Sequence, residues 1–174
     1  MWVFGFGSLV WNPGFPYEEA HLATVRGFSR RFCVYTHDHR GTWECPGLVL
    51  GLVPAAGNVC QGMGFRVAAG REAEVQAYLD ERELGDSVYE RAWLAIEVGA
   101  REERALTYVA NPQHPRCRLD LSAREAAAIV RQAAGRSGPN TEYVWKTREG
   151  LRSIGVREPH IEELAEQLGL EAKA

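Results

Sequence analysis

The chain has 174 residues, of which 45% are hydrophobic and 25% are charged, and its formal net charge is −3. We expect a single domain over residues 1–174, since a chain of this length can bury a substantial core. The basic residues occur only in short runs, and no stretch approaches the roughly 18 apolar residues that cross a bilayer. The N-terminus also lacks the pattern of an export signal. The sequence therefore predicts a cytoplasmic protein that binds neither nucleic acid nor membranes.

The first predicted element is a short strand that runs into a glycine-containing loop, within VFGFGSLVWN at residues 3–12. The loop lacks the third glycine of a dinucleotide-binding fingerprint, no helix pattern follows it, and it is not a P-loop. Ser8 lies outside a GxSxG elbow, which argues against a nucleophilic serine. Two interpretations stay open. The loop offers backbone N–H groups to a carboxylate or an oxyanion, or it is a tight turn without a ligand.

Further short segments that are apolar or alternating, and bounded by Gly, Pro or Asn, predict strands. They are residues 30–36, 47–54, 62–68, 91–98 and 105–111. Glycines at positions 51, 62 and 64 suggest bends of the kind that close a barrel. Because the strands come first and most helices come last, we predict an α+β fold, a small mixed β-barrel or curved sheet with helices packed on it.

A helix is predicted over residues 71–85, between two of the strands. Its apolar stripe consists of Val75, Tyr78 and Leu79, at the spacing i, i+3, i+4. Asp80 and Glu81 point away from this stripe, and we expect both to be solvated.

Glu83 is the unusual residue of this helix. At about 100° per residue it lies about 40° beyond Leu79, at the edge of the buried face. It also lies in the last turn, where the helix dipole disfavours a carboxylate. A residue that breaks two local preferences is a candidate functional residue. The alternative is that Glu83 only forms an ion pair with Arg82 or another arginine at the helix end.

Three helices are predicted in the C-terminal part of the chain. The first has a capping box, Ser122 followed by Glu125, and is expected to stop at Gly135. The second begins near Asn140 and stops near Gly155. The third has Pro159 in its first turn and ends at Gly169. Its apolar stripe consists of Ile161, Leu164 and Leu168.

The residues that commonly bind metals are scattered. The four cysteines are Cys33, Cys45, Cys60 and Cys117, with no CxxC pair among them. His37 and His39 would share one face of a strand, but no third ligand accompanies them. We therefore expect no metal and no disulfide, and we interpret the two histidines as part of a polar loop or hairpin turn.

Six motifs in a fixed order resemble the ChaC group of γ-glutamylcyclotransferases, the glutathione-specific kind. They are MWVFGFGSLVWNPGFPY at the start, RRF with DHRG, PGLVLGLVP, CQGMGFRV, YLDERE and GRSGPNTEYV. The resemblance extends over residues 1–168. It implies a small mixed barrel with helices packed on it, no cofactor, and cleavage of glutathione to 5-oxoproline and cysteinylglycine.

The resemblance also implies site residues. The substrate loop of the family, V-F-G-Y-G-S-L, falls on Val3, Phe4, Gly5, Phe6, Gly7, Ser8 and Leu9. The catalytic glutamate ends the motif YLxxRE and falls on Glu83, the residue that the helix pattern selects independently. We expect Arg40 of DHRG to bind the glycine-end carboxylate of the tripeptide. We expect Tyr143 to line the pocket, the alternative being a core tyrosine.

This chemistry needs no nucleophile from the protein. The α-amine of the γ-glutamyl group attacks its own amide carbonyl, closes a five-membered lactam and expels cysteinylglycine. The enzyme must deprotonate the ammonium, hold the chain curled and stabilise the oxyanion. Glu83 suits the first task as general acid and base. The backbone N–H groups of residues 5–9 suit the others, with glycines leaving room for the ligand.

The chain departs from the family pattern at four positions, which are Phe6, Leu48, Gln61 and Cys117. A lost hydrogen-bond partner can change specificity strongly, so another γ-glutamyl peptide or amine stays open as the substrate. A non-catalytic binder of γ-glutamyl compounds and a regulatory partner of an ion transporter are further alternatives. A thiol-based redox role has weaker support, since all four cysteines fall in strand-like or loop-like segments. The oligomeric state is not predicted.

Overall fold

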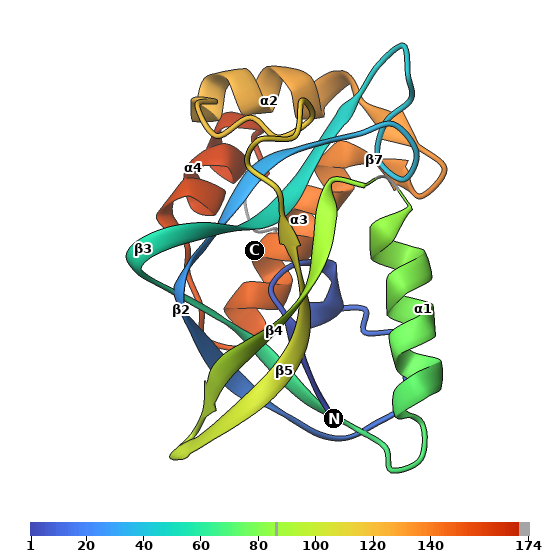
Figure 1. The fold of residues 1–174 in the computed structure, drawn as a ribbon. Helices are drawn as coiled ribbons and strands as arrows, with labels where there is room; N and C mark the ends of the chain where they lie inside the picture. The colour runs from blue at the N-terminus through green and yellow to red at the C-terminus, as the bar shows by residue number, and fades with distance from the viewer. Residues whose placement is uncertain (86, 171–174) are drawn as a thin grey trace. The chain divides into compact units, whose positions relative to one another are not determined.

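A computed structural model describes residues 1–85 and 87–170 of the chain (Figure 1). The chain divides into two compact units. The first unit contains residues 1–30 and 52–111, and the second contains residues 31–51 and the chain from Pro112 onward. Two long strands, β2 (Tyr17–Thr36) and β3 (Gly47–Val67), contribute residues to both units. The expectation of one domain over residues 1–174 stays a prediction.

Five strands form a closed barrel in the order β1-β3-β2-β4-β5. The three shorter strands are β1 (Trp2–Gly5), β4 (Tyr89–Val98) and β5 (Arg101–Ala110). The barrel is mixed because β1 pairs antiparallel with β3 and parallel with β5. Together with the helices, this barrel confirms the predicted α+β class.

The barrel corrects two details of the predicted strands. The segments expected at 47–54 and 62–68 belong to the single strand β3, in which Gly57 has a φ of 79°. Strand β2 begins at Tyr17, well before the predicted segment. The prediction missed its first half because that half is mostly solvent-accessible and carries little apolar pattern. Gly62 also has a role other than the expected bend. A Cβ there would lie 2.3 Å from the carbonyl oxygen of Gly5, so a close approach of backbones requires the glycine.

Helix α1 (Glu72–Leu84) packs on strand β4 within the first unit (Figure 1). Val75 and Leu79 are buried and Tyr78 is partly buried against the same core, which confirms the predicted stripe. The two buried residues join a core cluster of the first unit that consists of Val3, Leu9, Phe15, Phe65, Val67, Val75, Leu79, Leu106 and Tyr108. A fully buried leucine contributes about 2 kcal/mol, so this cluster fixes α1 against the strands and the loop after β1.

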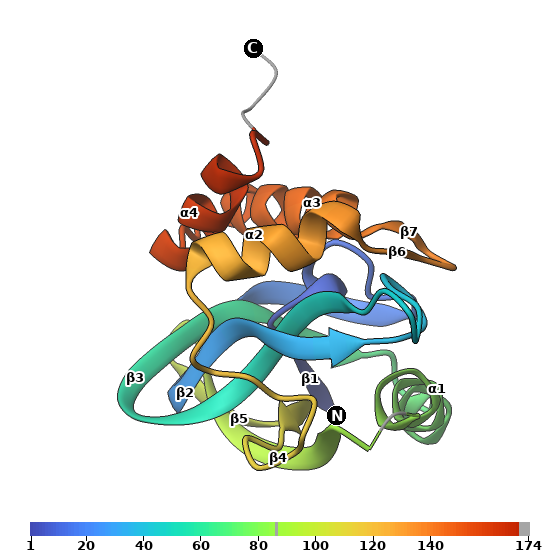
Figure 2. The ribbon, with the colours of Figure 1, turned by 90° about the horizontal axis from the view of Figure 1, so that it is seen from above.

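The second unit contains three helices, α2 (Ala123–Gln132), α3 (Asn140–Ser153) and α4 (Pro159–Gln167), which pack on one another (Figure 2). The capping box of α2 is present, with Glu125 accepting from the Ser122 N–H at 2.9 Å. Helix α2 ends at Gln132 and not at Gly135, because Ala134–Gly135 (β6) pairs with Gly138–Pro139 (β7) in a short hairpin.

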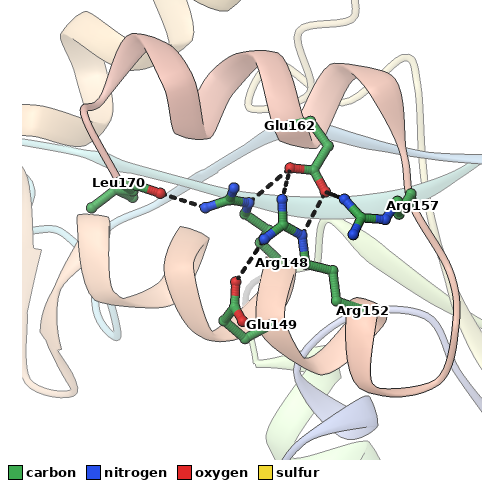
Figure 3. Close-up of polar contacts among 6 residues, drawn as sticks. All are labelled: Arg148, Glu149, Arg152, Arg157, Glu162 and Leu170. Carbon is green, nitrogen blue, oxygen red and sulfur yellow. Dashed lines mark hydrogen bonds and ion pairs between the residues drawn. The ribbon is translucent and has the colours of Figure 1, made fainter. Parts of the chain in front are cut away.

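Ion pairs join α3 to α4 around Glu162 (Figure 3). Glu162 accepts hydrogen bonds from Arg148 Nε at 2.8 Å and from Arg152 Nη2 at 2.6 Å. Arg157 lies 3.9 Å from the same carboxylate, and Arg148 also donates to the carbonyl of Leu170. This arrangement holds two helices together within the second unit.

In the described part of the chain, no helix combines the length and the apolar character needed to cross a membrane.

Candidate active site

The glycine loop follows β1 and is anchored by one buried side chain. Strand β1 ends at Gly5, and a short 3-10 helix, η1 (Ser8–Val10), follows. Leu9 of this helix is buried in the core of the first unit. A Cβ on Gly5 would lie 2.8 Å from Leu9 Cβ and 3.3 Å from the Phe65 ring. Gly5 is therefore required for the packing of Leu9, a reason different from the expected access for a ligand.

Among residues 3–9, Ser8 is the residue with a partly exposed side chain, while the other six are buried. The N–H of Val10 donates to Gly7 O at 2.9 Å, and that of Asn12 donates to Ser8 O at 2.8 Å. The first N–H groups of a 3-10 helix have no acceptor within the helix. The loop thus offers backbone donors and one hydroxyl.

Glu83 lies in the last turn of α1, and its side chain is 20% exposed. This position confirms the prediction that it lies at the edge of the buried face. Burial raises the pKa of its carboxyl above the usual range, and the charge of Arg82 opposes that rise. A carboxyl in such surroundings takes up a proton more readily than a solvated one.

The ion pair with Arg82, which was the alternative interpretation of Glu83, is also present in the structure. Arg82 Nε lies 3.2 Å from Glu83 Oε1. The other nitrogens of the same guanidinium donate to the loop, since Nη2 lies 2.8 Å from Ser8 Oγ and Nη1 lies 3.1 Å from Asn12 O. Arg82 therefore connects Glu83 to the glycine loop, a connection that the sequence pattern did not indicate.

Asp80 was expected to be solvated, and this prediction was wrong. Its carboxylate accepts from the Tyr108 hydroxyl at 2.7 Å and from Arg91 Nη1 at 2.7 Å. These partners come from β5 and β4, so the periodicity of the helix alone could not reveal them. The pKa of Tyr108 is raised by burial, by Asp80 and by the charge of Glu83. Tyr108 is thus within electrostatic reach of Glu83. Glu81 is exposed, as predicted.

Arg40 and Tyr143 lie in the second unit. Arg40 is buried, and its Nη1 donates to Pro139 O at 3.0 Å and to Glu142 Oε2 at 2.7 Å. Its guanidinium lies over the Tyr143 ring, 5.9 Å from the centroid. Tyr143 is also buried, and its hydroxyl accepts from the Leu50 N–H at 3.4 Å. Both side chains therefore have contacts within their own unit, and their role toward a substrate stays a prediction.

Three of the four departures from the family pattern are buried side chains, Phe6, Leu48 and Cys117, while Gln61 is exposed. Cys117 Sγ lies 3.8 Å from Cys33 Sγ. All four cysteines are in the described part of the chain, and none is in a disulfide. Burial raises the pKa of the Cys33 and Cys117 thiols, which disfavours the thiolate that redox chemistry requires.

The two histidines of the sequence THDHRG have other partners. The His37 ring stacks on Trp43 with centroids 4.2 Å apart, and His39 Nδ1 lies 2.8 Å from Ser137 Oγ. Within residues 1–85 and 87–170, no three His, Cys, Asp or Glu side chains are grouped so that they could hold a metal ion.

The barrel and its helices are the fold of a γ-glutamylcyclotransferase. A crystal structure of the glutathione-specific enzyme from yeast matches with a TM-score of 0.86 at 22% identity, covering 98% of this chain and 98% of that chain. The glutathione-specific γ-glutamylcyclotransferase 1 of Danio rerio is 33% identical over 92% of this chain and 85% of its own length. The corresponding Schizosaccharomyces pombe enzyme is 32% identical, over 94% and 90%.

A family model described as ChaC-like protein matches residues 1–170. The chain belongs to this family, which confirms the resemblance seen in its motifs.

Proposed function

We propose that this protein is a γ-glutamylcyclotransferase that cleaves glutathione to 5-oxoproline and cysteinylglycine, with Glu83 as general acid and base. The family membership and the names of the relatives support the reaction. The assignment of Glu83 as general acid and base rests on the surroundings of its side chain. Its carboxyl is four-fifths buried, has a raised pKa, and is connected by one arginine to the loop after β1.

Glu83 would act twice in the reaction. It first accepts a proton from the α-ammonium of the γ-glutamyl group, which leaves a neutral amine to attack the γ-carbonyl. The protonated carboxyl then donates to the departing nitrogen of cysteinylglycine. A raised pKa helps both steps, because proton transfer is most efficient when the pKa of the catalytic group lies near the working pH. Arg82 limits the rise, so that the carboxylate form stays accessible.

Residues 3–9, which form the end of β1 and the loop after it, would bind the γ-glutamyl end of the substrate. The side chains of Val3, Phe4 and Leu9 are buried, so these residues would act by fixing the backbone. The loop N–H groups suit the α-carboxylate or the developing oxyanion. The Ser8 hydroxyl is the accessible side-chain donor. Gly5, Phe6 and Gly7 complete the proposed loop.

Two further substrate contacts are proposed from the family resemblance. Arg40 suits the glycine-end carboxylate as a guanidinium donor, and Tyr143 suits the pocket wall. We also propose the cytoplasm as the compartment, because thiols stay reduced there and none of the four cysteines, all described, forms a disulfide.

The test is mass spectrometry of the purified protein with glutathione and, separately, with γ-glutamylalanine, following 5-oxoproline. We expect product from glutathione with the wild type and loss of product with Glu83→Gln. Glu81→Gln is the matched control, because Glu81 is an exposed carboxylate on the same helix. Product from γ-glutamylalanine alone would assign a different γ-glutamyl substrate. Product from neither substrate would overturn the assignment as an enzyme and favour a non-catalytic binding protein.

A further inference from the structure

The Arg82 guanidinium contacts both parts of the candidate site, and all of its contacts lie within the first unit. Its Nε faces the Glu83 carboxylate, and its Nη2 donates to Ser8. Its Nη1 donates to the Asn12 carbonyl and to the Tyr78 hydroxyl. One planar group thus connects the end of α1 to the loop after β1.

We propose that Arg82 is a positioning residue for the cyclotransferase reaction, which holds Glu83 against the substrate loop and orients the Ser8 hydroxyl toward the substrate. This inference rests on the proposed function.

The first step concerns Glu83. Arg82 Nε lies 3.2 Å from Glu83 Oε1, and both side chains are about one-fifth exposed, at 19% and 20%. An ion pair at this depth is poorly screened by solvent and restrains the carboxylate. The charge of Glu83 also acts on Tyr108, whose hydroxyl donates to Asp80, and Asp80 in turn accepts from Arg91. Arg82 is therefore the cation adjacent to the proposed base.

The second step concerns Ser8. A serine hydroxyl has one hydrogen to donate and accepts through its oxygen. Because Ser8 Oγ accepts from Arg82 Nη2 at 2.8 Å, its hydrogen is left for another acceptor. A charged donor on the oxygen also polarises the O–H bond. Ser8 is the accessible side chain of the loop, so the acceptor that it suits is an oxygen of the bound γ-glutamyl group.

The third step concerns the orientation of the guanidinium. Nη1 lies 3.0 Å from the Tyr78 hydroxyl and 3.1 Å from Asn12 O. Gly14 has a φ of 74°, and a Cβ there would lie 2.2 Å from the same hydroxyl. The glycine therefore lets Tyr78 reach Arg82. A lysine has one nitrogen in place of this rigid fork and cannot make these contacts together.

The experiment measures kcat and KM for glutathione against pH in four variants. Arg82→Met removes the charge and the fork, and Arg82→Lys keeps the charge alone. Ser8→Ala removes the oriented hydroxyl. Arg71→Met is the matched control, because Arg71 pairs with Glu74 on the exposed first turn of the same helix. Circular dichroism of each variant verifies that it is folded.

We expect the acidic limb of kcat/KM in Arg82→Met to move to higher pH by about one unit, because Glu83 loses its neighbouring cation. Arg82→Lys should keep the acidic limb of the wild type while KM rises about tenfold. Ser8→Ala should raise KM about fivefold without moving the limb. Arg71→Met should match the wild type. If Arg82→Met does not fold, Arg82→Lys still tests the proposal, because it should raise KM without moving the acidic limb.

A merely structural role for Arg82 predicts a lower rate with an unmoved acidic limb in both substitutions, and that result would overturn the inference. A wild-type KM in Arg82→Lys would overturn it as well. Failure of the proposed function is distinguishable, since the wild type itself would then form no 5-oxoproline. A ¹³C NMR titration of the Glu83 carboxyl in wild type and Arg82→Met measures the coupling without turnover, and equal pKa values would contradict it.

Discussion

Glu83 in the first unit and Glu162 in the second have nearly equally exposed side chains, but their carboxyl pKa values are shifted in opposite directions. Their side chains are 20% and 21% exposed, and each lies beside arginine. Burial raises the pKa of Glu83, whereas hydrogen bonds from Arg152 and Arg148 lower the pKa of Glu162 (Figure 3). Exposure alone therefore does not decide the behaviour of a carboxylate.

The difference lies in what the arginines bind. Glu162 receives hydrogen bonds from two guanidinium groups, which stabilise its ionised form. Arg82 directs its Nη atoms to Ser8, Asn12 and Tyr78, and its Nε lies 3.2 Å from Glu83 Oε1. An arginine can thus restrain a carboxylate while leaving it able to take up a proton. The comparison separates a carboxylate suited to catalysis from one that joins two helices.

The largest expected effect is on activity. Glu83→Gln should lower kcat for 5-oxoproline formation by about 10²- to 10⁴-fold, because a general acid and base is lost. Glu162→Gln should leave kcat within about twofold, once measured at a temperature where it is folded. Equal losses in the two variants would contradict the division of roles.

The next largest effect is on stability, where the Glu162 substitution should have the larger effect and the Glu83 substitution the smaller. Glu162→Gln should lower the free energy of unfolding by about 2 kcal/mol, less than for a fully buried pair because solvent reaches this carboxylate. Glu83→Gln should leave stability unchanged or raise it by up to about 1 kcal/mol, because a buried charge is removed. Urea unfolding of both variants measures this, and a strongly destabilised Glu83→Gln would assign Glu83 a structural role.

The pH dependence of stability should also have opposite signs. The folded-state pKa of Glu83 lies above the unfolded value of about 4.3, so wild-type stability falls as pH rises from there through the folded-state pKa. The gain from Glu83→Gln should therefore appear only above about pH 4.3. Glu162 has a lowered folded-state pKa, so its contribution is present at neutral pH and is lost as pH falls through that pKa. Urea titrations at several pH values test both signs.

The smallest effect concerns the support of Arg82. Gly14 and Gly70 have similar φ values, 74° and 77°. A Cβ on Gly14 would meet the Tyr78 hydroxyl at 2.2 Å, while nothing lies within 4 Å of one on Gly70. Both alanine substitutions should cost about 1 kcal/mol for the backbone, and Gly14→Ala should cost about 1 kcal/mol more. Only Gly14→Ala should lower kcat/KM. Equal kcat/KM in the two variants would show that Tyr78 does not support the site.

Part of the site could be predicted from the sequence because it follows local rules. The spacing of Val75 and Leu79 determined which face of α1 is buried, and Glu83 followed from the same geometry. The partners of Asp80 could not be found in this way, because Tyr108 and Arg91 come from strands that approach only in the folded chain. For the same reason Arg82 was considered only as a pair for Glu83.

The fold shows the same limit. Capping residues and glycines located the helices to within a few residues, and the apolar runs located most strands. The first half of β2 was missed, because its mostly accessible residues carry little apolar pattern. Gly5 was interpreted as room for a ligand, whereas its neighbour Leu9 explains it by packing. The pairing of β2 with β4 is long-range, and the contact of Gly5 with Leu9 depends on how the loop folds back on the core. Single-sequence periodicity contains neither.

The parallel pairing of β1 with β5 has a consequence for the order of assembly. β1 takes its partners from β3 and β5, so both of its edges are satisfied only after the chain has been synthesised as far as Ala105 and Leu106 of β5. The loop that begins at Gly5 is made before β5, yet it gains its framework only when β5 is added. Contacts this distant along the chain slow folding. A nascent chain that stops before β5 therefore carries the motif of the site without its geometry.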